Sequence, residues 1–237
     1  MARYLCHDEP DLFEFEAEVI DARPGAALLS RSAFYPGGGG QLADHGAIEW
    51  IGGVVAVTGF EERDGMVWIA LAEPVEIQGR ALGRIDKDFR HMMAQLHTDL
   101  HIVNALVFQR FGGALVTGVQ MAADETARID FDLPDANNDL LRALEPEFNA
   151  VIEQDLPVIE QFVREDQARQ EPGLIRSKSV APPPQPDGTI RVIEITGLDR
   201  QACGGTHLAS TGGSRPVRIV KIDNKGRQNR RIKIGLA

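Results

Sequence analysis

Two short segments of the chain carry residue types that can bind a metal ion. In CGGTH, two glycines and a threonine separate Cys203 from His207, and in HTDLH, His97 and His101 are four residues apart. Histidines at positions i and i+4 of a helix lie on one face, about 5–6 Å apart. A thiolate and three imidazoles form a soft, tetrahedral donor set that zinc prefers and magnesium or calcium does not. The spacing therefore predicts one zinc site formed by all four residues.

Each motif also has an ordinary explanation when it is taken alone. Histidine pairs at this spacing occur on helix surfaces without a metal, and a free cysteine is often buried in a tight turn. Cys203, however, is the only cysteine after residue 87, and Gly204 and Gly205 leave the backbone free to curl around one ion. No glutamate follows His97, so the H-E-x-x-H motif of zinc proteases is absent. Together the two motifs favour a metal site.

The histidine pair lies within the segment that has the clearest helical periodicity. Apolar residues recur at helical spacing over 89–107, Asp88 is a suitable N-cap, and Gly112 is a suitable end. A second helical region is expected over 138–155, where Pro146 breaks or restarts the helix. The first of these helices would hold both histidines on one face.

Apolar patterns on both sides of this helix predict strands. Apolar and acidic residues alternate in LFEFEAEVI, which is the period of a half-buried strand. Further strand candidates are residues 46–60, 65–75, 114–122, 126–133, 157–163, 189–195, 217–222 and 230–236. We therefore predict a β-rich first domain that is joined to an α+β second domain near residue 87.

The composition is that of an ordinary globular protein with an acidic balance. The chain has 237 residues and a formal net charge of −10, and it has no apolar run long enough to span a bilayer. Its N-terminus lacks the basic and apolar regions of a signal peptide, and two cysteines far apart do not suggest a disulfide framework. We therefore expect a cytoplasmic protein with no membrane partner.

The charge is unevenly distributed, because the C-terminal segment is basic. From Arg215 onward, eight Lys and Arg residues accompany a single acid, Asp223. Such a strip can contact the phosphates of a nucleic acid. The alternative is a solvated hairpin with basic residues on its outer face.

Taken in order, the motifs resemble those of the AlaX family of alanyl-tRNA editing proteins and of the editing domain of alanyl-tRNA synthetase. The matching segments are FYPGGGGQLADHG, HTDLH, GVQM with ARIDFDL, and CGGTH with TGG, and they span nearly the whole chain. The resemblance implies a small β-barrel-like domain with the glycine motif over 1–86. It further implies a zinc-binding α+β editing domain over 87–237, in which the four residues named above bind zinc. Nothing in the chain resembles an aminoacylation domain.

The family's reaction is hydrolysis of the ester that joins a wrong amino acid, chiefly serine, to the terminal adenosine of tRNA(Ala). The resemblance implies that Gln120 lies in the editing pocket, where its amide holds the substrate or the attacking water. It assigns recognition of the serine hydroxyl to Thr117, with Gly118 as the alternative position, and glycine there would leave Gly-tRNA(Ala) as a second substrate. Zinc would polarise the ester carbonyl, lower the pKa of a bound water, or only orient the substrate.

Two segments are expected to contact the nucleic acid. The glycine-rich loop lacks the Lys-Ser/Thr ending of a P-loop, so ATP is not expected, and the loop either forms a tight turn or lies near the tRNA end. The residues expected to contact the acceptor end of tRNA(Ala) are Gly38, Gly39, Gly40, Gln41, Arg230 and Arg231.

Three functions are consistent with these features. The first is a zinc-dependent aminoacyl-tRNA deacylase that acts in trans on Ser-tRNA(Ala), with Gly-tRNA(Ala) as a second substrate. The others are a tRNA-binding module with a structural zinc and a zinc hydrolase of another small ester. The basic tail favours the first two functions over the third, and Gln120 favours the deacylase over the binding module.

Overall fold

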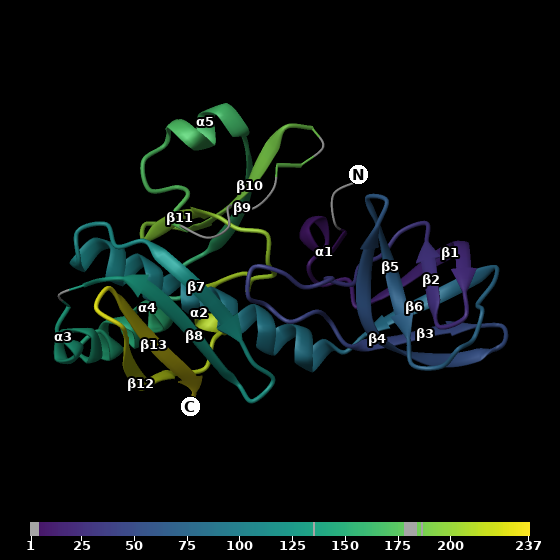
Figure 1. Ribbon diagram of the computed structural model, residues 1–237, viewed down its shortest axis with the longest axis horizontal. Helices are drawn as coiled ribbons and strands as arrows, with labels where there is room; N and C mark the ends of the chain where they lie inside the picture. Colours follow the sequence, from purple (N-terminus) through teal and green to yellow (C-terminus); the bar gives the residue numbers. More distant parts are fainter. Residues whose placement is uncertain (1–4, 135, 178–183, 186) are drawn as a thin grey trace. The chain divides into compact units, whose positions relative to one another are not determined.

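The computed structural model describes residues 5–134, 136–177, 184–185 and 187–237, and it divides the chain into two compact units (Figure 1). The first unit contains Met1–Gly38 and Leu42–His91, and the second contains Gly39–Gln41 and Met92–Ala237. Three residues of the glycine-rich loop therefore belong to the same unit as the four candidate metal ligands.

The first unit is a closed β-barrel of six antiparallel strands in the order β1-β2-β5-β4-β3-β6. The elements of this unit are α1 (Leu5–Asp8), β1 (Glu14–Arg23), β2 (Ala26–Leu29), β3 (Gly46–Trp50), β4 (Gly53–Arg63), β5 (Met66–Leu71) and β6 (Arg80–Ile85). Alternating burial over the first six residues of β1 places Phe15, Ala17 and Val19 inside and three glutamates outside, as the sequence pattern predicted, whereas Ile20 at the end of that pattern is exposed. The expected small N-terminal β-barrel is confirmed.

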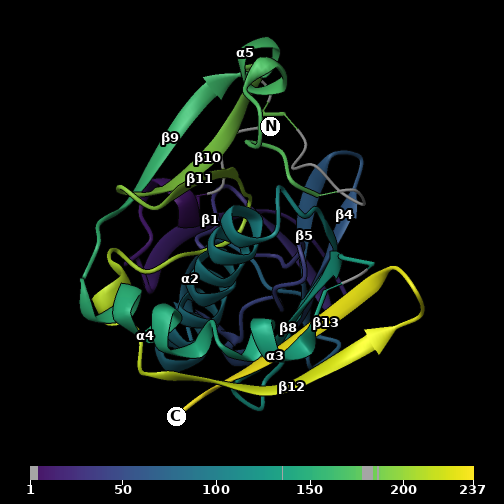
Figure 2. The same cartoon turned by 90° about the vertical axis from the view of Figure 1, so that its left-hand side faces the viewer.

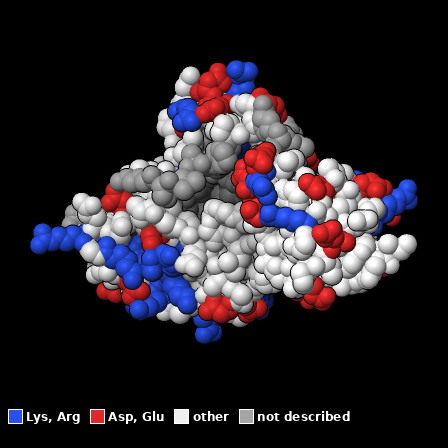
Figure 3. Space-filling view, turned by 45° about the vertical axis from the view of Figure 1, so that its right-hand side comes forward, with Lys and Arg blue, Asp and Glu red and all other residues white. Residues whose placement is uncertain are grey.

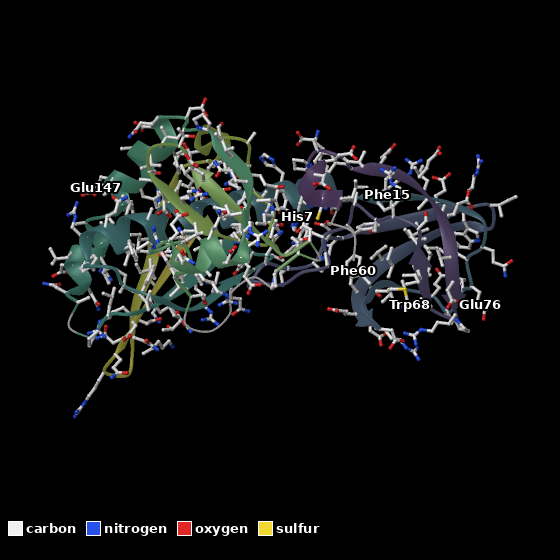
Figure 4. All side chains as sticks on the ribbon, turned by 90° about the horizontal axis from the view of Figure 1, so that it is seen from above. His7, Phe15, Phe60, Trp68, Glu76 and Glu147 are labelled. Carbon is white, nitrogen blue, oxygen red and sulfur yellow. The ribbon has the colours of Figure 1, made fainter. Side chains whose placement is uncertain are left out.

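The interior of the barrel is apolar and aromatic. The ring of Phe34 lies edge-on to Phe15 at a centroid distance of 5.5 Å and also contacts Phe60 at 5.7 Å (Figure 4 labels Phe15 and Phe60). Gly83 on β6 has no room for a side chain, because a Cβ atom there would lie 2.3 Å from the ring of Phe15. This aromatic and aliphatic cluster therefore provides packing for the barrel.

One buried ion pair anchors the loop between β2 and β3 within the first unit. Arg90 donates from Nε to Oδ1 of Asp44 at 2.8 Å and from Nη2 to the carbonyl of Ala33 at 2.8 Å. The same aspartate accepts a hydrogen bond from the backbone N–H of Tyr35 at 2.6 Å. Both ends of the glycine-rich loop are thereby held in place.

The second unit is an α+β domain built around one long helix. Its helices are α2 (Lys87–Arg110, whose first residues belong to the first unit), α3 (Asn138–Arg142), α4 (Glu145–Glu153), α5 (Glu165–Gln170) and a 3₁₀ turn (Thr211–Gly213). Its strands are β7 (Val116–Met121), β8 (Thr126–Asp132), β9 (Val158–Arg164), β10 (Thr189–Ile195), β11 (Asp199–Ala202), β12 (Val217–Lys225) and β13 (Asn229–Leu236). Figures 1 and 2 place α2 between a four-stranded sheet, β12-β13-β8-β7, and a three-stranded sheet, β11-β10-β9. The expected α+β class is confirmed.

The ends of the helices follow local rules, with one difference from the sequence analysis. Pro146 lies in the first turn of α4 and restarts the helix there, as predicted. The N-terminus of α2 is capped by Asp86, whose Oδ1 accepts from the N–H of Phe89 at 3.0 Å, and not by Asp88. Among the described residues, no helix is both long enough and apolar enough to cross a membrane.

Candidate metal centre

The central helix of the second unit buries an unusual number of polar side chains. Residues 93–107 of α2 are buried on every side. The polar residues among them are Gln95, His97, Thr98, Asp99, His101 and Asn104. A polar group that is buried without a partner costs roughly 1–3 kcal/mol, so this stretch requires specific partners. Three of these residues, His97, Thr98 and His101, contribute to the candidate site together with their partners.

Four donor atoms from two segments converge beside α2. His97 and His101 come from the helix, and Cys203 and His207 come from the loop after β11. Their ligand atoms all lie within 4.8 Å of one another, and the first three side chains are buried. The Cys203 Sγ atom lies 3.3 Å from Nε2 of His97 and 3.3 Å from Nε2 of His207. The structure thus brings together the four residues that the sequence singled out.

The spacing of these atoms fits a tetrahedral ion. Bond lengths of about 2.3 Å to sulfur and about 2.0–2.1 Å to nitrogen place the sulfur and nitrogen ligands roughly 3.6 Å apart in a tetrahedron. The two observed distances of 3.3 Å are close to this value. Small inward or outward adjustments of the side chains are therefore enough for this group to hold a metal ion.

Gln41 orients the first histidine. Its Oε1 atom lies 2.8 Å from Nδ1 of His97 and accepts the N–H of Thr206 at 3.0 Å, while its Nε2 donates to Thr206 Oγ1 at 2.8 Å. Because an amide oxygen only accepts, Nδ1 of His97 carries the proton and Nε2 presents a lone pair towards Cys203. One glutamine therefore sets the tautomer of His97 and also fixes the CGGTH loop.

Thr98 plays the corresponding role for His207. Its hydroxyl donates to the carbonyl of Ala94 at 2.9 Å, so its lone pairs are left to accept hydrogen bonds. They accept the N–H of Leu208 at 3.1 Å and face Nδ1 of His207 at 3.4 Å. His207 thereby also presents Nε2 to the sulfur atom. Thr98 and Thr206 are the threonines of HTDLH and CGGTH, and the spacing of the ligands did not predict their role.

The charge states of the ligands follow from burial. Burial lowers the pKa of His97 well below its ordinary value, and the neighbouring His101 and Arg191 lower it further. Burial, with Arg191 and Arg176, lowers the pKa of His101 to about 3. Burial raises the pKa of the Cys203 thiol. Both of these imidazoles are therefore neutral at neutral pH, and of these three ligands only the thiol would lose a proton to a bound cation.

Asp99 lies between the two helical histidines in sequence but does not belong to the donor group. Its Oδ2 atom accepts from the hydroxyl of Ser214 at 3.0 Å. Burial raises the pKa of its carboxyl to about 8, although the Ser214 hydrogen bond opposes this shift. Two positions along a helix correspond to a rotation of about 200°, so Asp99 faces away from the histidines.

Glycine is required at two points around the site because of close contacts. A Cβ atom at Gly205 would lie 2.1 Å from Cε1 of His97, whereas one at Gly204 would meet nothing within 4 Å. Gly40 has a φ angle of +83°, and a Cβ atom there would lie 2.5 Å from the carbonyl oxygen of Val119. Its own carbonyl accepts the N–H of Met121 at 2.8 Å. Gly40 therefore lets the backbone of residues 39–41 approach β7 closely and supports Gln41.

These positions change the expectation for the glycine-rich loop. Gln41 is only 4% exposed and its amide is occupied by His97 and Thr206, so the structure does not favour it as a tRNA contact. Gly40 lies against β7. Gly38 and Gly39 are exposed with positive φ angles, and they remain candidates for such a contact.

The two residues expected in the editing pocket lie on β7. Gln120 is exposed, and its Oε1 accepts from Nε of Arg128 at 3.0 Å. Thr117 lies at a β-bulge between Val116 and Gly118, and its buried hydroxyl has no hydrogen-bond partner among the described residues. A bulge redirects the side chain of the extra residue. The described residues therefore leave this hydroxyl without the partner that a buried polar group needs.

The outer face of the four-stranded sheet carries a row of cations. The register places Gln120 opposite Arg128, Arg128 opposite Lys233, and Lys233 opposite Lys221. Like charges directly opposite each other on neighbouring strands destabilise a sheet. Figure 3 shows Lys and Arg side chains gathered on this part of the second unit. We call Arg128, Lys233 and Lys221 the cation row.

Arg230 and Arg231 lie on opposite faces of this sheet, because successive residues of a strand alternate. Arg231 is on the outer face and donates to both carboxylate oxygens of Asp130 at 2.7 Å. Arg230 is only 9% exposed and donates to the carbonyl of Pro134 at 2.8 Å. The structure therefore does not favour Arg230 as a tRNA contact, because its guanidinium is used inside the protein.

Comparison with known proteins agrees with the geometry. Residues 190–233 match the family described as the threonyl and alanyl tRNA synthetase second additional domain. The chain is 32% identical over 223 residues to the alanyl-tRNA editing protein AlaX-M of Saccharolobus solfataricus, covering 92% of each chain. It is 33% identical over 232 residues to AlaX-M of Methanosarcina acetivorans, covering 93% of each.

A longer relative shows the same region inside a larger protein. The chain is 32% identical over 220 residues to the alanine–tRNA ligase of Korarchaeum cryptofilum, covering 92% of this chain but only 24% of that protein. The resemblance inferred from the motifs is confirmed over almost the whole length. The donor group, the fold and the relatives agree. This chain therefore belongs to the AlaX family of alanyl-tRNA editing proteins.

Proposed function

We propose that this chain hydrolyses mischarged tRNA(Ala) in trans, chiefly Ser-tRNA(Ala), at a zinc site formed by His97, His101, Cys203 and His207. The observation that carries the proposal is the convergence of these four donor atoms within 4.8 Å in a chain whose relatives are named alanyl-tRNA editing proteins. In this proposal residues 87–237 form the editing domain, and residues 1–86 form an accessory β-domain.

The donor set supports zinc in preference to a harder ion. Three imidazole nitrogens and one sulfur are soft ligands, and magnesium or calcium would require oxygen ligands. When bound, zinc supplies a Lewis acid that can polarise the ester carbonyl or make a water molecule more acidic. The protein's own contribution is to hold neutral imidazoles in the correct tautomer, through Gln41 for His97 and Thr98 for His207.

Four protein ligands would occupy every position of a tetrahedral zinc ion. A catalytic role would therefore require one of these ligands to make way for water or substrate. His207 is the best candidate, because it is the only member of the group that is partly exposed. Its contact to Thr98 is 3.4 Å, longer than the 2.8 Å contact that holds His97. A partly exposed ligand beside three buried ones is consistent with a site that opens towards a substrate.

Two residues of β7 would act on the substrate. The unpaired buried hydroxyl of Thr117 would recognise the serine hydroxyl, because selecting serine over alanine needs a polar partner that an apolar pocket lacks. Gln120 would orient the ester or the attacking water, which requires its side chain on the outer face of the sheet to give up the contact with Arg128. The glycyl ester, which lacks a hydroxyl, would be the slower substrate.

The tRNA would be held by phosphate contacts to the outer face of the four-stranded sheet. The cation row begins beside Gln120 on β7 and crosses β8, β13 and β12. The Cβ atoms of cross-strand neighbours lie about 5 Å apart. Arg128 and Lys221 already pair with Asp130 and Asp223 at 2.9 Å, so tRNA phosphates would compete with these carboxylates. Arg231, and the exposed Gly38 and Gly39, are further candidates for contacts to the acceptor end.

Deacylation assays with Ser-tRNA(Ala), Gly-tRNA(Ala) and Ala-tRNA(Ala) test the proposal. We expect rapid release of serine, slower release of glycine and little release of alanine, with activity lost to a chelator and restored by zinc. Binding of tRNA(Ala) without any hydrolysis would instead indicate a tRNA-binding module with a structural zinc. Hydrolysis of simple esters but not of charged tRNA would indicate a different zinc hydrolase.

A further inference from the structure

A buried arginine lies behind the CGGTH loop. Arg191 is in β10, the central strand of the three-stranded sheet, and it is 5% exposed. Its Nη1 donates to two carbonyls of the loop, that of Cys203 at 3.1 Å and that of Gly205 at 2.7 Å. Its Nε donates to Oε2 of Glu160 on β9 at 2.6 Å. The side chain thus joins the sheet to the backbone of the loop.

A charge at this position is not explained by the stability of the fold. The neighbours Ile190, Val192 and Ile193 on the same strand are buried and apolar. Replacing a buried ion pair with apolar residues of similar volume is often neutral or stabilising, because the charges must be desolvated. A different benefit must therefore come from the contacts that the guanidinium makes.

Those contacts determine the geometry of the segment that carries the thiol. The two carbonyls lie on either side of Gly204, so one nitrogen atom of Arg191 fixes both ends of a three-residue turn. The backbone N–H of Cys203 also donates to the carbonyl of Arg191 at 3.1 Å. With its carbonyl turned towards the arginine, Gly205 directs its N–H to Cys203 Sγ at 3.5 Å and packs against His97.

Charge alone would make Arg191 unfavourable beside a metal ion. A guanidinium and a divalent cation repel each other, and the repulsion is strong where both are buried. Removing the positive charge should therefore tighten metal binding if electrostatics were its only effect. Loss of affinity on removal would instead have to come from the lost hydrogen bonds.

We propose that Arg191, held in place by Glu160, is a positioning residue that fixes the CGGTH loop so that Cys203 and His207 converge on the same ion as the helical histidines. This inference rests on the proposed metal site, but not on the proposed substrate. Removal of a side chain that orients a metal ligand typically lowers metal affinity by about 10–100-fold.

The test measures zinc affinity by chelator competition, without tRNA, for Arg191→Met and Arg191→Lys. We expect Arg191→Met to lose about 10–100-fold in affinity. Arg191→Lys should recover part of the loss, because an ammonium can donate to one or two of the carbonyls but lacks the fixed fork of the guanidinium. Glu160→Gln, which keeps the shape of the side chain, should show a smaller loss and provides a second measurement if Arg191→Met does not fold.

Arg176→Met is the matched control. Arg176 is also buried in an ion pair, with Asp199, and it donates to the carbonyl of Gly173. None of its observed hydrogen bonds within the described chain reaches residues 203–207. Removing it deletes a nearby positive charge without releasing the loop, so zinc affinity should stay equal or rise.

Three outcomes would overturn the inference. Affinity in Arg191→Met that equals or exceeds that of the wild type would show that the arginine acts only as a charge. An equal loss in Arg176→Met would show a general effect of disturbing this sheet. A wild-type protein that binds no zinc would overturn the proposed metal site as well, whereas absence of deacylation with normal zinc binding would leave the role of Arg191 standing.

Discussion

The two units of this protein use their interiors for different purposes. The barrel buries aromatic and aliphatic side chains, and the Arg90–Asp44 ion pair anchors a loop of the same unit. The second unit buries polar side chains along its central helix, and some of them, including His97 and Thr98, have hydrogen-bond partners in distant segments. An apolar core contributes stability through burial, whereas buried polar groups at best offset their own desolvation. Polar burial along α2 is therefore explained by a function, and mutations in the two units should have different consequences.

The largest effect on metal binding is expected from the thiol. Structural zinc sites bind with about 10–16 kcal/mol, so removing one of four ligands should cost roughly 3–4 kcal/mol, or about 10²–10³-fold in affinity. Cys203→Ser should therefore lose most of its zinc on purification, measured as metal per chain by elemental analysis. Cys6→Ser, which changes the buried cysteine of the first unit, should retain about one zinc. Full zinc content in Cys203→Ser would contradict the site.

The barrel should show the opposite pattern, in which stability changes and metal binding does not. Ile48 is fully buried on β3, and truncation of such a residue costs about 2–5 kcal/mol because it leaves a cavity. Ile48→Ala should lower the free energy of unfolding of the first unit in denaturant titrations, with unchanged zinc affinity in the remaining folded protein. A parallel loss of zinc affinity would mean that the two interiors are not independent.

Replacement of Gln41 should weaken zinc binding without changing the fold. Gln41→Leu keeps a similar volume but removes the acceptor for Nδ1 of His97 and both contacts to Thr206. We expect about a 10–100-fold loss of zinc affinity, measured by chelator competition. Gln95→Leu is the control, because Gln95 is a buried glutamine on α2, the helix that carries His97. Equal losses in both variants would indicate a general disturbance of α2.

The smallest effect is expected on the surface of the second unit. A surface ion pair contributes up to about 1 kcal/mol, so Lys221→Glu and Lys233→Glu should each raise KM for Ser-tRNA(Ala) by up to about fivefold. The effect should shrink as salt rises, because phosphate contacts release counterions. Arg80→Glu, an exposed charge of the barrel, is the control and should leave KM unchanged. Unchanged kinetics of the lysine variants at low salt would show that the cation row is a solvated surface that does not contact tRNA.

Local pattern was enough to predict much of the second unit. The helix with its two histidines, the restart at Pro146 and the alternating strands β8 and β13 all follow from periodicity and single-residue preferences. The pattern did not distinguish between two nearby residues of the same type where both were equally suitable. Asp86 and not Asp88 caps α2, and Arg230 turns inward while Arg231 turns outward. Such choices depend on which neighbours pack against the strand or the helix.

The sequence by itself determined the residue types of the donor group and the spacing within each pair, because i and i+4 on a helix and a four-residue turn are local relations. Only the tertiary structure decided which distant residues hold those donors. Gln41 lies 56 residues from His97 along the chain, and Arg191 lies 12 residues from Cys203. No periodic pattern in the sequence predicts either contact. Closure of the barrel between β1 and β6 is likewise a long-range pairing. Contacts of this kind form only when burial of the whole unit offsets the entropy of closing the intervening loops.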